Sequence, residues 1–170
     1  DIEPNRYDDT QLLQAIQSFT SGGLGTKPSV YQINANTIST TSQIPIDNTV
    51  PQITEGVELF SKSFVPSKEG AVIMIDAVLN CSSENGGNTV AALFEANEVG
   101  ALATFSHYYE NSNFYQSVVK FAFESPDAEM KTFSIRVGND SALGDTLHIN
   151  STNGAIASPM KSVLELREIA

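Results

Sequence analysis

The stretch Gln116–Val137, QSVVKFAFESPDAEMKTFSIRV, contains two short runs in which apolar and polar residues alternate. Every second residue is apolar from Val119 to Phe123, and again from Phe133 to Val137. Successive side chains of a β-strand point to opposite faces, so each run predicts a strand with one buried face. The intervening SPDA is rich in turn-forming residues, which separates the two strands by a turn.

Outward from this stretch, short strand-like runs recur, and segments rich in Gly, Asn, Ser, Asp and Pro separate them. The predicted strands are 57–64, 71–80, 89–96, 101–106, 116–124, 131–137, 146–150 and 162–168. No helical pattern lies between them. This arrangement predicts an all-β, antiparallel sandwich of jelly-roll type.

The segment Asp8–Phe19 is the one stretch with helical periodicity. Leu12, Ile16 and Phe19 share one face of the predicted helix. Three turns of helix are marginal in water, so this stripe needs a partner. The partner is either the β domain of the same chain or other copies in a short coiled coil. The following SGGLG predicts a flexible joint, which favours self-association through these three residues.

The chain therefore divides into a short helix and joint at 1–25, an extended β arm at 26–56, and a jelly-roll head at 57–170. The arm from Tyr31 to Ile46 lacks sustained alternation, and Pro45 has no N–H to donate. We therefore expect it to be an extended arm rather than a core strand.

If successive strands of the head run antiparallel, its loops alternate between the two ends of the sandwich. The loops near 65–70, 97–100, 125–130 and 151–160 then lie together, away from the arm. The loops near 81–88, 107–115 and 139–144 lie at the end of the arm. This count predicts that the first group is the free end of the head.

Composition limits the partners. The 170 residues include 9 Lys and Arg against 20 Asp and Glu, a formal net charge of -11, which repels phosphate backbones and anionic lipid. No apolar run approaches the roughly 18 residues needed to cross a bilayer. We expect neither nucleic-acid binding nor membrane insertion. The single cysteine, Cys81, excludes an intrachain disulfide framework and indicates a small buried residue.

Several stretches resemble the C-terminal heads of bacteriophage tail fibres and related trimeric fibre tips. They are DTQLLQAI at 9–16, IPIDNTVPQITEG at 44–56, SFVP at 63–66, ALF at 92–94, TFSIRVG at 132–138 and LELREI at 164–169. The resemblance implies a homotrimer of jelly-roll heads on a threefold axis, attached to an upstream fibre shaft. It further implies contact with a bacterial cell-surface glycan or outer-membrane protein. The location it implies is a virion tail fibre, or an extracellular fibre of bacterial origin.

No catalytic or metal-binding pattern stands out. His107 and His148 are the two histidines, and neither has metal-ligand spacing. Asp76, Glu95 and Glu124 fall in predicted strands, where we expect them to face solvent or pair across strands. We expect no enzyme activity and no cofactor.

The segment HYYENSNFY, residues 107–115, is the richest candidate for recognition. Aromatic rings stack on the apolar faces of sugars, and they also anchor protein interfaces. The candidate receptor-binding residues are His107, Tyr108, Tyr109, Asn113 and Tyr115 in this segment, with Lys68, Asn97 and Asn153 in polar loops. The alternative is that the rings pack inside the sandwich or against a neighbouring subunit, and that the loop residues are ordinary solvated turns.

Two other functions stay open. A monomeric carbohydrate-binding module of a secreted protein is also a β-sandwich, but it would leave the helical stripe without a partner. A small hydrolase has no residue-level support. Oligomeric mass distinguishes the first alternative from the fibre head, and loss of polysaccharide viscosity would indicate the second.

Overall fold

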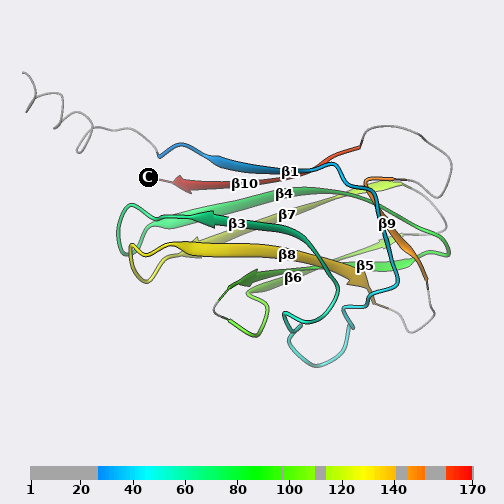
Figure 1. The fold of residues 1–170 in the computed structure, drawn as a ribbon. Helices are drawn as coiled ribbons and strands as arrows, with labels where there is room; N and C mark the ends of the chain where they lie inside the picture. Colours follow the sequence, from blue (N-terminus) through cyan, green and yellow to red (C-terminus); the bar gives the residue numbers. More distant parts are fainter. Residues whose placement is uncertain (1–26, 97, 110–113, 141–144, 152–159, 170) are drawn as a thin grey trace, which may run out of the picture.

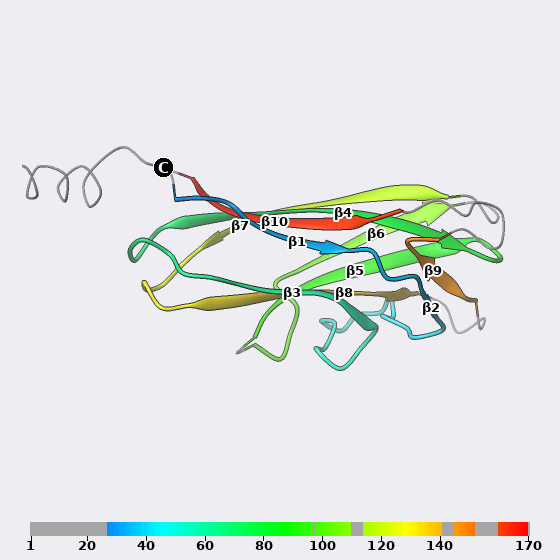
Figure 2. The ribbon, with the colours of Figure 1, turned by 45° about the horizontal axis from the view of Figure 1, so that its top comes forward.

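The fold is a sandwich of two antiparallel β-sheets (Figures 1 and 2). A computed structural model describes residues 27–96, 98–109, 114–140, 145–151 and 160–169. The helix predicted at residues 8–19, with Leu12, Ile16 and Phe19, lies outside these ranges. None of the described elements is a helix, and the described residues therefore hold no helical segment that could cross a membrane.

Each sheet has its own set of strands. Sheet A contains β1 (Val30–Asn34), β2 (Ile38–Thr40), β4 (Val72–Ser83), β7 (Tyr115–Glu124), β9 (Leu147–Ile149) and β10 (Ser162–Ile169). Sheet B contains β3 (Val57–Phe64), β5 (Gly87–Glu95), β6 (Ala103–Tyr109) and β8 (Lys131–Asn139), in the order β3-β8-β5-β6. The eight predicted strands are all present, and β3 has the predicted bounds.

Sheet A is four strand positions wide, because two positions are each filled by two short strands. β10 pairs with residues 72–78 of β4, and β9 pairs with residues 81–83 of the same strand. β1 pairs with β10 and β2 pairs with β9 in the next position. β7 pairs with β4 as well. Four positions in each sheet give a jelly-roll-like sandwich.

The main core lies between the two sheets. Inward-facing side chains of both sheets are fully buried there, including Phe60, Phe133 and Ile135 from sheet B and Ile75 and Leu164 from sheet A. Burial of such side chains contributes roughly 1.5–3 kcal/mol each relative to exposure. The alternation read from the sequence therefore identified the inward faces correctly.

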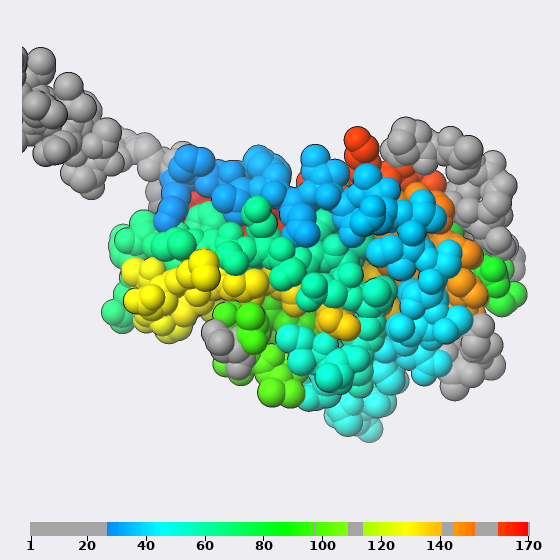
Figure 3. Space-filling model, in the orientation of Figure 1, coloured from blue at the N-terminus to red at the C-terminus, as the bar shows by residue number. Residues whose placement is uncertain are grey.

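The expected arm is instead part of the domain. Residues 30–34 and 38–40 are strands of sheet A. Ile44 is fully buried against the outer face of sheet B, where it contacts a second cluster that includes Val90 and Phe94. Figure 3 shows residues 27–56, in blue and cyan, running along the surface of the molecule. The sequence conceals this role, because the two strands are short and show little alternation. Their backbone groups are satisfied by sheet partners far along the chain.

Gly138 permits this packing. A Cβ atom at this position would lie 2.8 Å from the Ile44 nitrogen and 2.9 Å from the Ser42 oxygen. The Ile44 N–H donates to the Asn139 oxygen at 2.9 Å, and the Asn139 N–H donates to the Ser42 oxygen at 3.1 Å. The missing side chain therefore lets residues 42–44 lie directly on β8.

The two ends of the sandwich are distinct. At the near end, Lys27 Nζ donates to the Val65 oxygen, and the Gly70 N–H donates to the Ser125 oxygen at 2.8 Å. The β3–β4, β5–β6 and β7–β8 connections all start and finish there. The β4–β5, β6–β7, β8–β9 and β9–β10 connections start and finish at the far end (Figure 1).

This arrangement corrects the predicted ends. The flanking strands confirm that residues 65–70, 97–100 and 125–130 share one end. The described chain begins at that same end, whereas the prediction had made it the free end. The flanks of residues 151–160 lie at the other end, since Ser162 Oγ donates to Asn150 Oδ1 at 2.8 Å. The count failed because β1 and β2 occupy a strand position, and because β9 and β10 run in the same direction along β4.

Ile44→Ala tests whether residues 27–56 belong to the folded unit. Removing a fully buried isoleucine should lower the free energy of unfolding by about 2–5 kcal/mol, through lost burial and a residual cavity. Ile46→Ala is the matched control: Ile46 is 56% exposed, and the change should stay within about 0.5 kcal/mol. Thermal unfolding followed by circular dichroism measures both. Equal melting temperatures for the two variants would show that the segment does not stabilise the domain.

Candidate functional site

The two long sides of the sandwich differ. On the β1–β3 side, Asn34 Nδ2 donates to the Leu59 oxygen at 2.9 Å, and the Ser61 N–H donates to Gln32 Oε1 at 3.0 Å. These bonds join sheet A to sheet B. On the opposite side, the edge strands β6 and β7 flank two cavities, one toward each end. Candidate binding groups therefore gather on the β6–β7 side.

Three aromatic residues, here called the aromatic cluster, lie at the far end of this side: His107 and Tyr115 stack on each other, and Tyr108 follows His107 on the opposite face of β6. The His107 and Tyr115 rings stack with centroids 4.8 Å apart and an interplanar angle of 11°. His107 comes from sheet B and Tyr115 from sheet A, so the stack joins the sheets across the far end. Tyr108, one position from His107, points to the other face of its strand and is 65% exposed.

Tyr115 holds the cluster in place. Its hydroxyl donates to Thr89 Oγ1 on β5. Thr89 is 2% exposed and stands opposite His107 in the β5–β6 register. A hydrogen bond at one end and a ring stack on one face restrict the Tyr115 side chain. The stack of His107 and Tyr115 is therefore ordered before any ligand arrives, which reduces the entropy cost of binding.

A cavity of about 280 Å³ lies beside the stack. Its walls combine Leu79, Ala91, Phe105 and Val118 with Thr89, Ser106, His107, Gln116 and Ser117. The Ser117 hydroxyl is buried and has no hydrogen-bond partner among the described residues. A buried polar atom without a partner costs about 1–3 kcal/mol, so this hydroxyl would gain from a polar ligand or a water.

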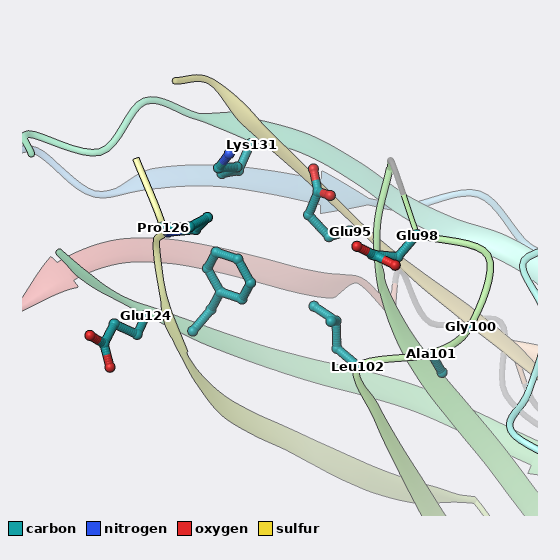
Figure 4. Close-up of a pocket in the computed structure, with 9 residues that line it drawn as sticks. Glu95, Glu98, Gly100, Ala101, Leu102, Glu124, Pro126 and Lys131 are labelled. Atoms are coloured by element: carbon teal, nitrogen blue, oxygen red, sulfur yellow. The ribbon is translucent and has the colours of Figure 1, made fainter. Parts of the chain in front are cut away.

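A second cavity, of about 620 Å³, lies at the near end between the β5–β6 loop and the β7–β8 turn (Figure 4). Glu95 and Glu98 line the loop side, and Pro126 and Lys131 line the other. Glu95 is 6% exposed, so it does not face solvent, which was one of the two positions expected for it. Asp76, by contrast, pairs across strands as predicted, with Arg167 at 3.2 Å.

The positive charge in the near-end cavity is already paired. Lys131 Nζ lies 2.8 Å from one Asp127 oxygen and 3.0 Å from the other. The hydrogen bond from Lys131, followed by that from the Glu129 N–H, lowers the pKa of the Asp127 carboxyl below its ordinary value.

The structure brings some of the predicted site residues together and not others. His107 and Tyr115 stack at the far end and Tyr108 lies there on the other face of β6, whereas Lys68 is exposed at the near end. The backbone of Tyr109 ends β6. Asn97, Asn113 and Asn153 fall outside the described ranges. Sequence reasoning missed Thr89 and Ser117, although the alternation of β7 places Ser117 on the same inward face as Tyr115.

Comparison with known proteins assigns no family. No family model matches the sequence, and no curated protein does. Among solved structures, the Eiger TNF of S. frugiperda has 13% identity over 85% of this chain and 94% of its own, with a TM-score of 0.43. The sugar-binding EclA C-terminal domain has 10% identity over 77% of this chain and 85% of its own, with a TM-score of 0.38.

A third similar structure is the insecticidal delta-endotoxin Cry8Ea1 of Bacillus thuringiensis. It has 12% identity and a TM-score of 0.39 over 71% of this chain, and the match spans a fifth of the endotoxin. At TM-scores below 0.5, these likenesses identify neither a family nor a function.

The cysteine beside the aromatic cluster yields a test of local packing. Cys81 stands opposite Tyr115 and is fully buried, and this burial raises the pKa of its thiol to about 12. At pH 8 roughly one such thiol in ten thousand is ionised, against roughly a quarter for a free cysteine. Alkylation by iodoacetamide should therefore be at least a thousandfold slower in the native protein than in denaturant. A native rate within tenfold of the denatured rate would show that this region opens readily.

Proposed function

We propose that this chain is the receptor-binding, adhesive head of a homotrimeric fibre of the phage type, and that it recognises a glycan on a cell surface. The observation that carries the proposal is the position of the aromatic cluster. His107, Tyr108 and Tyr115 lie at the end of the sandwich opposite Lys27. A fibre joined through the preceding residues would leave this end facing outward.

The chemistry of the far end suits a sugar. A sugar ring has apolar C–H faces that pack on aromatic rings, and hydroxyls that need directional hydrogen bonds. The exposed imidazole of His107 and the Ser117 hydroxyl both line the far-end cavity, and the exposed ring of Tyr108 offers a second apolar contact on the outer face of sheet B. A volume of about 280 Å³ is close to the lower limit of ligand pockets, which suits one sugar unit better than a long chain.

The proposed role is binding without bond-making. The faces of the aromatic rings, the Ser117 hydroxyl and the Gln116 amide would hold a neutral polyol. No cofactor or metal enters the proposal. The net charge of -11 favours a ligand that is neutral or cationic over a phosphate-rich one. Because the proposed role is contact with a cell, the proposed location is the outer end of a virion tail fibre, or of a bacterial surface fibre.

Tyr108→Ala and His107→Ala should each weaken binding to whole bacterial cells at least tenfold, because aromatic anchors at a contact commonly contribute 2 kcal/mol or more. The measurement is the half-saturating concentration of labelled protein on a strain that the wild type binds. Lys68→Ala is the control at the opposite end and should bind like wild type. Loss of binding by Lys68→Ala with unchanged binding by Tyr108→Ala would place the receptor contact at the near end instead.

The homotrimer has a separate test. Light scattering of the full chain should report about three times the 18.3 kDa of one chain, and Ile16→Asp or Phe19→Asp should lower that mass by placing a charge in the apolar stripe. Asp8→Asn, outside the stripe, should keep it. A single-chain mass at micromolar concentration, together with glycan binding, would favour the monomeric carbohydrate-binding module.

A further inference from the structure

The outer face of sheet A has an apolar row that crosses all four strand positions. The register places Ile33 of β1 opposite Val163 of β10, Val163 opposite Val78 of β4, and Val78 opposite Val118 of β7. Ile33 is 61% exposed and Val118 is 56% exposed. Single exposed aliphatic residues are ordinary, but a contiguous row across a sheet marks an interaction surface.

The next row on this face carries balanced charge once Arg167, from the row beyond it, is included. It aligns Tyr31, Glu165, Asp76 and Lys120 across the same four positions. Tyr31 donates to Glu165 at 3.1 Å, and Asp76 pairs with Arg167 at 3.2 Å and with Lys120 at 3.9 Å. Two cations thus offset two anions here, whereas the whole chain carries -11. Copies of so anionic a chain repel one another least where their facing surfaces are locally neutral.

The β6–β7 side is a different surface, and its apolar side chains are incompletely covered. Phe105, Phe121 and Phe123 reach the main core there but are only partly buried, and the two cavities leave this side incompletely filled. β6 and β7 are also the edge strands of their sheets, and edge strands carry backbone groups open to pairing. This side gains apolar burial when another molecule covers it.

From these observations we infer that the outer face of sheet A packs against the near-end part of the β6–β7 side, around Phe123 and the near-end cavity, of a second copy of this chain, which leaves the far-end cavity open. The inference depends on the homotrimer in the proposed function and names the surfaces that form it. Two unlike patches make a head-to-tail contact, and such contacts form rings when the rotation closes. The patches meet at β7, so each contact turns the next copy sharply, as a small ring requires. Tyr108 points outward from sheet B and remains accessible.

Ile33→Asp in the full chain tests the first patch. The wild type should have the mass of three chains by light scattering, and Ile33→Asp should have the mass of one chain at the same micromolar concentration. Ile46→Asp is the matched control, since Ile46 is 56% exposed on the segment that covers sheet B. It should remain trimeric. Circular dichroism melting checks that both variants are folded.

Thiol labelling tests both patches without adding charge. Cys81 is fully buried, so an introduced cysteine is the reactive one. Maleimide should label Ile33→Cys and Pro126→Cys at least tenfold more slowly than Ile46→Cys in the trimer, and at a similar rate after dissociation in mild denaturant. Pro126 is exposed in the β7–β8 turn beside the near-end cavity, which makes it a reporter for the second patch.

The outcomes are distinct. A trimeric Ile33→Asp, or equal labelling of Ile33→Cys and Ile46→Cys in the trimer, overturns the inference and leaves the trimer standing. Protection at residue 33 without protection at residue 126 overturns the pairing of the two patches. A wild type with the mass of one chain overturns both the trimer and this interface, while cell binding by the far end is judged independently by the Tyr108→Ala comparison.

Discussion

Hydrogen bonding between β1 and β10 determines which end of the sandwich holds the first described residues. The pairing of Val30 with Leu166 places the first described residues beside the end of the last strand, so both lie at the near end. From β3 to β9 the connections between strands then alternate between the two ends. His107, Tyr108 and Tyr115 are carried to the far end as a consequence, because β6 runs toward it and β7 runs away from it.

A second constraint is the unequal closure of the two sides. Asn34 and Gln32 bond across to β3, and residues 41–56 cover the outer face of sheet B. The β6–β7 side receives no comparable cover from the described residues, and both cavities lie along it. The proposed ligand site and the proposed subunit contact therefore share one cause, which is that a single strand pair closes only one side of a two-sheet sandwich.

The strands of the head were predictable because their alternation is local. Val57–Phe64 was predicted with the observed bounds, and Phe133 and Ile135 are buried as the period of two requires. β1 and β2 were missed as sheet strands, since five and three residues carry too little alternation to be recognised. The break between β9 and β10 was read as a reversal of direction, although both strands run along the same edge of β4.

The amino-acid sequence by itself determined the all-β class, the inward face of most strands and the aromatic character of the 107–115 segment, because each depends on residues close together in the chain. Only the tertiary structure decided which end carries those aromatics, which rings stack, and that Ile33, Val163, Val78 and Val118 form one row. The physical reason is that these relations come from hydrogen bonds between strands distant in sequence, whose partners and register no local pattern specifies.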